Sequence, residues 1–132
     1  MRTPVDLDEA AAAIERRRPI WTSAGFEVGE VTWRDVALGW PYSIGARQQT
    51  TDPDSVGVRG IRGTIEFSVV LFGGQHHASY GSWADVEGAD FAGGAVETNT
   101  LEVDDLSAFE QLLDSTFERW AHLTLRTFGD AG

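Results

Sequence analysis

The stretch that decides the fold is Ile65-Glu66-Phe67-Ser68-Val69-Val70-Leu71-Phe72-Gly73-Gly74. Its apolar residues at positions 65, 67, 69 and 71 share one face of a β-strand, because side chains alternate between the two faces of a sheet. Val70 and Phe72 add apolar side chains to the other face, so we expect the end of this strand to be covered on both sides. Gly73-Gly74 is typical of a hairpin turn and predicts a second strand over about 76–86.

Alternating segments continue upstream of this hairpin. Residues 31–40 and 42–46 alternate between apolar and polar types, and residues 51–55 have the composition of a turn. We expect the glycines of Gly57-Val58-Arg59-Gly60-Ile61-Arg62-Gly63 to occupy turn and bulge positions that lead into a strand at Thr64.

Downstream, Gly88, Gly93 and Gly94 mark a loop around Phe91. A last, mostly polar strand is predicted over 95–103. With the upstream segments, this makes four to five neighbouring strands.

A helix is predicted at the N-terminal end. Asp6 and Glu9 have the spacing of a capping box. The apolar spacing that follows predicts a helix over about 7–18. Pro19 should end or kink it, because proline lacks an N–H, although the apolar stripe resumes at Trp21 towards about 23.

A second helix is predicted at the C-terminal end, capped by Asp104 or Asp105 and ended by Gly129. Its apolar stripe at helical spacing consists of Leu106, Phe109, Leu112, Leu113, Phe117, Trp120 and Leu123.

This order of elements predicts a single α+β domain over residues 1–132, with residues 1–5 and 129–132 frayed. Hairpin-length connections favour an antiparallel meander of four to five strands. Both helices can then pack on one face of the sheet and leave the other in water. No apolar stretch is long enough for a bilayer span and no signal peptide is recognisable, so we expect a cytoplasmic protein.

The charge is strongly acidic and unevenly placed. The chain of 132 residues has 21 acidic and 10 basic residues, all arginine, and a formal net charge of −11. Residues 66–132 contain twelve acidic residues and two arginines, so they carry −10 of that charge. This balance argues against binding to DNA, RNA or a membrane surface. It favours a basic protein partner, or solubility alone.

The residues with catalytic or ligating chemistry form no recognisable motif. The chain has no cysteine, which excludes disulfides and thiolate metal sites. His76 and His77 are adjacent on a predicted strand, so they point to opposite faces and cannot share a metal. The glycine run 57–63 lacks a P-loop lysine, although it could bind a small anion through backbone N–H groups. We therefore predict no catalytic, metal or cofactor residues.

The tryptophans and the acidic residues together suggest an interface. Trp21, Trp33 and Trp120 are predicted core residues, whereas Trp40 and Trp83 are less clearly buried. Aromatic side chains beside carboxylates suit a protein interface, because the ring supplies buried area and the acids steer association. The predicted partner-binding residues are Trp83, Asp85, Glu87, Asp90 and Glu97.

Four segments support a resemblance to a known family: Ser23-Ala24-Gly25, the strand 63–70, the acidic strand 96–103 and the helix entry 104–109. In outline the chain resembles the small actinobacterial immunity proteins, in particular the immunity protein TriTu type. The segment Arg34–Ser55, with Trp40-Pro41-Tyr42, has no counterpart in that resemblance. The resemblance implies a protein that binds and neutralises a cognate toxin and catalyses no reaction.

Three hypotheses follow. The first is a non-enzymatic inhibitor of a basic partner, most concretely the immunity half of a bacterial toxin pair. The second is a small-molecule-binding or enzymatic domain, with a pocket between sheet and helices lined by Trp33, Tyr42 and Phe67. The third is a structural or regulatory module that forms a homodimer through an exposed sheet face or edge.

Overall fold

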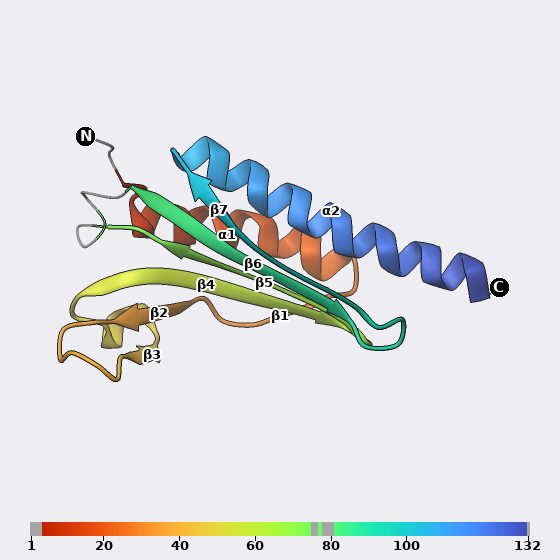
Figure 1. Cartoon of the computed structure of the whole chain (residues 1–132), viewed down its shortest axis with the longest axis horizontal. Coiled ribbons are helices and arrows are strands. Elements are labelled where there is room, and N and C mark those ends of the chain that lie inside the picture. The colour runs from red at the N-terminus through yellow and green to blue at the C-terminus, as the bar shows by residue number, and fades with distance from the viewer. Residues whose placement is uncertain (1–3, 75–76, 78–80, 132) are drawn as a thin grey trace.

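The structure is a computed structural model that describes residues 4–74, 77 and 81–131, with side chains up to His122. It is an α+β fold in which two helices cover one face of a single antiparallel sheet (Figure 1). The helices are α1 (Leu7–Ser23) and α2 (Leu106–Ala131), one near each end of the chain. The predicted class and the predicted placement of the helices are confirmed.

The sheet has seven strands, which is more than the four to five predicted. The four long strands form an antiparallel meander, as expected: β4 (Pro53–Arg62), β5 (Ile65–Phe72), β6 (Ser82–Asp90) and β7 (Ala95–Val103). Of these four, however, β4 lies where turns were predicted.

Three short strands complete the sheet on the other side of β4: β1 (Glu27–Val28), β2 (Thr32–Asp35) and β3 (Ser43–Gly45). β1 and β2 both pair with β4, and β3 pairs with β2. A short 3₁₀ helix, Arg47–Gln49, links β3 to β4. β2 and β3 lie within the predicted alternating segments 31–40 and 42–46, whereas β1, with two residues, is too short for an alternating pattern to identify.

β4 corrects the interpretation of the glycine run. Gly57 and Gly60 lie inside this strand and not in turns, whereas Gly63 has a φ of +58° at the turn to β5. A Cβ at Gly60 would lie 2.8 Å from the Phe67 ring of β5. Gly60 is therefore needed because a large neighbouring side chain crosses the strand there.

The start of α1 follows its predicted capping box. The Glu9 N–H donates to Asp6 Oδ1 at 2.9 Å. Contrary to one expectation, the helix continues through Pro19 to Ser23. Pro19 is exposed, so water can hydrate the carbonyl that it leaves unpaired, and buried Trp21 in the next turn holds the helix end against the core.

α2 begins with Asp105 as its cap, whose Oδ1 accepts a hydrogen bond from the Ala108 N–H at 2.8 Å. The helix does not end at Gly129 but runs to Ala131. Phe109, Leu113 and Trp120 of its apolar stripe are buried in the core.

The core lies between the helices and the sheet. Phe67 of β5 stands at its centre, with edge-to-face contacts to Trp21 and Phe26 at centroid distances of 5.3 and 5.2 Å. Trp21, Trp33 and Trp120 are at most 4% exposed, which confirms their prediction as core residues.

Two features at one end of the sheet differ from the sequence pattern. Val5 is buried, and its N–H donates to Ser82 Oγ at 2.8 Å, so the chain is docked there before α1 begins. β6 starts at Ser82, later than the expected residue 76. His77 precedes it outside any strand, and His76 lies outside the described residues, so the predicted orientation of this pair is not tested.

Candidate functional site

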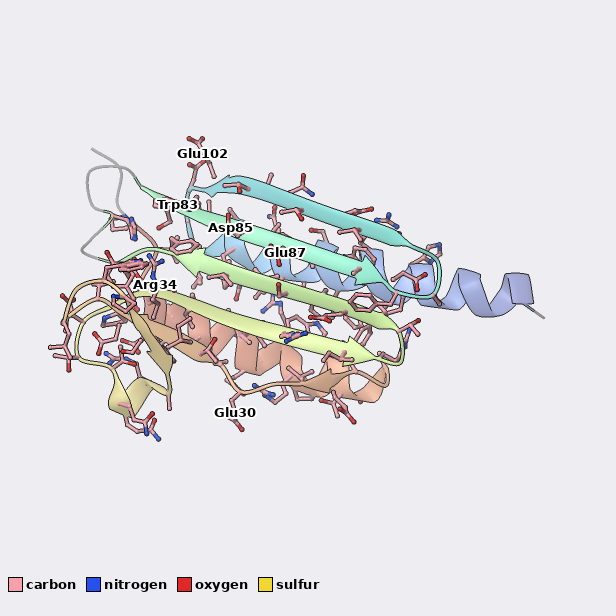
Figure 2. All side chains as sticks on the ribbon, turned by 60° about the horizontal axis from the view of Figure 1, so that its bottom comes forward. Glu30, Arg34, Trp83, Asp85, Glu87 and Glu102 are labelled. Carbon is pink, nitrogen blue, oxygen red and sulfur yellow. The ribbon has the colours of Figure 1, made fainter. Side chains whose placement is uncertain are left out.

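The sheet face opposite the helices is solvent-facing, and we call it the open face (Figure 2). The register between β4 and β7 assigns its side chains, because alternate residues on every strand share a face. Its centre consists of Glu66, Ser68, Val70 and Phe72 from β5, Trp83, Asp85, Glu87 and Ala89 from β6, and Val96, Thr98, Thr100 and Glu102 from β7.

Three of the five predicted partner-binding residues lie together on the open face. Trp83, Asp85 and Glu87 follow one another along β6 and point the same way in Figure 2. Alternate residues on a strand are about 6.8 Å apart, so the three form an evenly spaced row.

Asp90 and Glu97 point to the helix side of the sheet. Asp90 is buried and accepts hydrogen bonds from Thr64 Oγ1 and the Ala92 N–H, which shape the β6–β7 turn. Glu97 forms an ion pair with Arg119 of α2. The sequence did not indicate that Asp90 faces the helices, because the predicted strand ended at about residue 86 and Asp90 fell in the expected loop, whereas β6 extends to Asp90.

Arginines neutralise much of the acidic half on the helix side. Arg16 of α1 pairs with Glu110 at 2.6 Å, and Arg17 pairs with Asp114 at 2.7 Å. The two halves of the chain, so unequal in charge along the sequence, therefore compensate each other where α1 packs beside α2. The charge asymmetry is smaller in the folded molecule than along the chain.

The open face keeps more of its negative charge. Arg59 pairs with Glu66, but Asp85 has a neutral partner, the Thr100 hydroxyl, which donates to Asp85 Oδ1 at 2.8 Å. Glu87 has no hydrogen-bond or ion-pair partner among the described residues. The centre of β6 therefore presents two carboxylates that no arginine of the described chain contacts.

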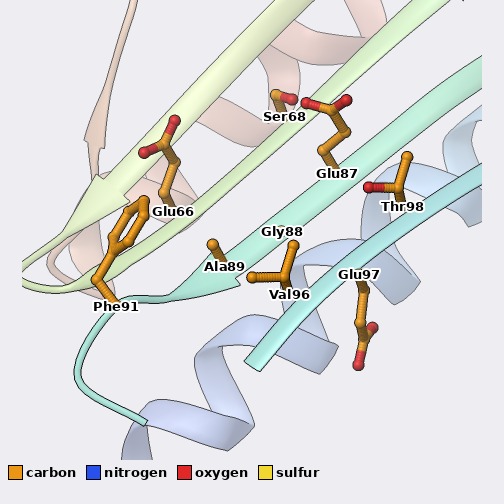
Figure 3. Close-up of a pocket in the computed structure, with 9 residues that line it drawn as sticks. All are labelled: Glu66, Ser68, Glu87, Gly88, Ala89, Phe91, Val96, Glu97 and Thr98. Carbon is orange, nitrogen blue, oxygen red and sulfur yellow. The ribbon is translucent and has the colours of Figure 1, made fainter. Parts of the chain in front are cut away.

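A pocket of about 330 Å³ opens beside Glu87 at the β6–β7 hairpin end of the open face (Figure 3). Phe91 and Val96 form its apolar walls and are 69% and 72% exposed. Glu66 and Glu87 supply carboxylates at its rim. A side chain with an aliphatic stem and a cationic head fits a pocket that has apolar walls and a negatively charged rim.

An aromatic and charged cluster closes the opposite end of the open face. The Trp83 ring stacks on Phe72 at a centroid distance of 5.2 Å, and the Arg34 guanidinium lies 4.9 Å from both the Phe72 and Tyr42 rings. Arg34 also donates through two nitrogens to the carboxylate of buried Asp54. Neither Arg34 nor Asp54 is predicted as a site residue from the sequence, because they are 20 residues apart and come together only when β2 pairs with β4.

The charge on Asp54 is stabilised despite its burial. Burial raises the pKa of this carboxyl, but the Arg34 hydrogen bonds and positive charge, with a smaller contribution from His77, lower the pKa below its ordinary value. His77 Nε2 lies 3.5 Å from Asp54 Oδ2, and the His77 ring meets Trp83 edge to face at 4.5 Å. Through Asp54, this cluster connects Arg34 of β2 to His77, which precedes β6.

The segment between β2 and β3 exposes two large apolar side chains. Leu38 is 98% exposed and Trp40 is 83% exposed. This segment belongs to Arg34–Ser55, the part of the chain outside the family resemblance.

The proposed small-molecule pocket between sheet and helices is not formed by its three predicted residues. Trp33 and Phe67 are packed in the core, whereas Tyr42 lies on the opposite side of the sheet against Arg34. Among the described residues, no three His, Asp or Glu side chains are placed to hold a metal ion.

Comparison with known proteins found no match among family models, curated proteins or solved structures. Within the described residues, neither helix combines the length and apolar character needed to cross a bilayer.

Proposed function

We propose that this chain is a non-enzymatic binding protein that neutralises a basic protein partner through its open face. In its most concrete form, it is an immunity protein that inhibits a bacterial toxin in the cytoplasm. The observation that carries the proposal is the carboxylate of Glu87, which has no partner among the described residues and borders a pocket walled by Phe91 and Val96. A lysine or arginine of the partner fits this pocket, with its stem on the apolar walls.

The distribution of charge supports this choice of surface. Glu97, Glu110 and Asp114 are paired with arginines, so they attract a cationic partner less strongly than Asp85 and Glu87 do. A toxin that acts on nucleic acid is basic where it grips phosphates, and a row of carboxylates can occupy that surface. The carboxylates would also accelerate association by electrostatic steering.

Trp83 adds contact area next to this row. Its ring is half-buried and held by Phe72 and His77, so it is already ordered before a partner binds. Rigid aromatic side chains lose little entropy on binding and commonly dominate interface energies. Trp83 is therefore the expected apolar anchor at one end of the carboxylate row.

Co-expression tests the proposal, with the products of the reading frames adjacent to this chain's gene as the toxin candidates. An adjacent product should arrest growth when expressed alone, and co-expression of this chain should restore growth. The double variant Asp85→Lys/Glu87→Lys should lose that protection. Glu118→Lys, a single charge reversal at an exposed residue of α2, should keep it and serves as the control.

Kinetics with the purified pair separate steering from a general loss of folding. Asp85→Lys/Glu87→Lys should slow association at least about tenfold at low salt, and the wild-type rate should fall as salt is added. Circular dichroism should show the same fold for both variants. The proposal would be contradicted if the wild-type chain relieved the growth arrest caused by none of the adjacent products. Equal protection by the double variant and the wild type would also contradict it.

A further inference from the structure

The helix layer covers β7 only in part. On β6 the helix-facing Ala84 is fully buried, whereas its partner on β7, Leu101, is 43% exposed. Asn99, the next helix-facing residue of β7, is also exposed. Two depressions of about 170 and 370 Å³ lie between β7 and α2, and both are lined by Leu101, Leu112 and Ser115. A continuous groove therefore runs between β7 and α2, which lie side by side in Figure 1.

The outer edge of β7 is open along this groove. β7 is the last strand of the sheet and, in the part of the chain that the structure describes, pairs only with β6. The pairing runs without a bulge over all nine residues of the strand, which contains neither proline nor lysine. Bulges, proline and lysine are common protections of edge strands. Glu97 is an inward-pointing charge near one end, so the open stretch is 98–103.

An added β-strand is the ligand that this edge fits. A free edge offers backbone N–H and C=O groups at every second residue, and an extended segment satisfies them in register. The side chains of that segment would alternate between two environments. One set enters the groove against Leu101 and Leu112, and the other set lies on the open face beside Thr100 and Glu102.

The two environments select different side chains. The groove side presents the apolar side chains of Leu101, Val103 and Leu112, which favour apolar residues. The open-face side lies next to Glu102 and two strand spacings, about 10 Å, from Asp85, which is close to the screening length at physiological salt. Lysine or arginine is favoured there, because long cationic side chains shorten that distance further.

We infer that β7 is a docking edge for an extended segment of the partner in which apolar residues alternate with lysine or arginine. The basic half of this pattern rests on the proposed function, whereas the strand pairing rests on the open edge and the groove. A second copy of this chain is the less suitable occupant, because each chain carries a net charge of −11.

A peptide that alternates leucine and lysine over about nine residues, blocked at both ends, tests the inference on the full chain. Binding is measured by fluorescence anisotropy, and protection of the β7 amides by hydrogen exchange. The expected result is slowed exchange along 98–103. Affinity should fall at least about tenfold for the same peptide N-methylated at every residue, which keeps its side chains and charges but cannot donate to a strand edge.

Two variants connect the binding to the groove and separate it from the open-face carboxylates. Ser115→Trp should fill the groove and lower the affinity for the unmethylated peptide at least about tenfold, with an unchanged circular dichroism spectrum. Asp85→Lys/Glu87→Lys should lower the affinity for this peptide less than Ser115→Trp does, and the peptide should still protect the β7 amides from exchange. If strand pairing persists while that double variant still inhibits the partner, the proposed function fails and the docking edge stands.

Other outcomes overturn the docking edge. Equal binding of the N-methylated peptide, or no protection of 98–103, would show that the peptide binds through charge alone, and the proposed function would be unaffected. A dimer of the free chain in light scattering that Ser115→Trp dissociates would show that a second copy occupies the groove.

Discussion

Trp120 of α2 packs directly on Gly88 of β6, so that a Cβ at position 88 would overlap the indole ring. Gly88 is paired with Glu97 on β7 and with Phe67 on β5, in the middle of the sheet. The absence of a side chain at this one position allows α2 to approach the sheet closely. The contact therefore sets the distance between the two layers.

Gly88→Ala should destabilise the protein by about 1–3 kcal/mol, because the added methyl group forces Trp120 or α2 to move. Urea unfolding followed by circular dichroism measures this loss. Gly29→Ala is the matched control, since a Cβ there would meet only the Arg59 carbonyl oxygen at 3.7 Å. Equal stability of the two variants would show that the layers can separate without cost.

Asp54 should make stability depend on pH in the acid range. Its folded pKa is lowered, so the folded state releases this proton more readily than the unfolded chain. The stabilisation is complete above the ordinary carboxyl pKa of about 3.9, and it is lost as the pH falls through the lower folded pKa.

Asp54→Asn removes that titration and leaves Arg34 without its carboxylate. The variant should be less stable at pH 7 by about 1–3 kcal/mol, and its stability should fall less steeply than that of the wild type below about pH 4. Urea unfolding over this pH range measures both effects. Parallel curves for the two proteins would mean that Asp54 titrates alike in the folded and unfolded states.

The helix cap at Asp105 should contribute measurably to stability. Asp105→Ala leaves the Ala108 N–H without its acceptor and should cost about 1 kcal/mol in thermal or urea unfolding. Ser107→Ala changes an exposed residue in the same turn and should have an effect within about 0.5 kcal/mol. A Ser107→Ala loss as large as that of Asp105→Ala would contradict a specific capping role.

The exposed segment between β2 and β3 should matter little for stability. Leu38→Ser and Trp40→Ser change side chains that are 98% and 83% exposed, so unfolding should shift by no more than about 0.5 kcal/mol. Trp21→Ala, at a fully buried position, should cost about 3–5 kcal/mol. A large loss in Trp40→Ser would show that this ring is packed.

Fluorescence quenching checks the same assignment independently of stability. Trp21, Trp33 and Trp120 are buried and Trp83 is half-buried, so acrylamide should quench mainly Trp40 in the folded protein. Trp40→Phe should therefore remove most of the easily quenched emission. Unchanged quenching in this variant would place the accessible tryptophan elsewhere.

The sequence alone was sufficient where the signal is local. Alternation from Ile65 to Leu71 identified β5, and the polar strand 95–103 was predicted with its observed bounds. The capping role of Asp6 and the apolar stripe of α2 were also predictable. Each of these depends on residues within a few positions of one another, and on the periods of 2 and 3.6 that the backbone geometry imposes.

Tertiary structure decided what no local pattern contains. The glycines of β4 resemble turn residues in the sequence, but they are required by Phe67 and Val70 on a neighbouring strand. Asp90 and Glu97 lie on the opposite side of the sheet from Trp83, Asp85 and Glu87. This placement depends on how far β6 extends and on the register of β7 against β6 across the turn. Arg16 and Arg17 reach acids almost a hundred residues away, because α1 and α2 pack side by side. Which charges stay unpaired depends on packing between distant segments, and so the candidate interface emerged only from the folded chain.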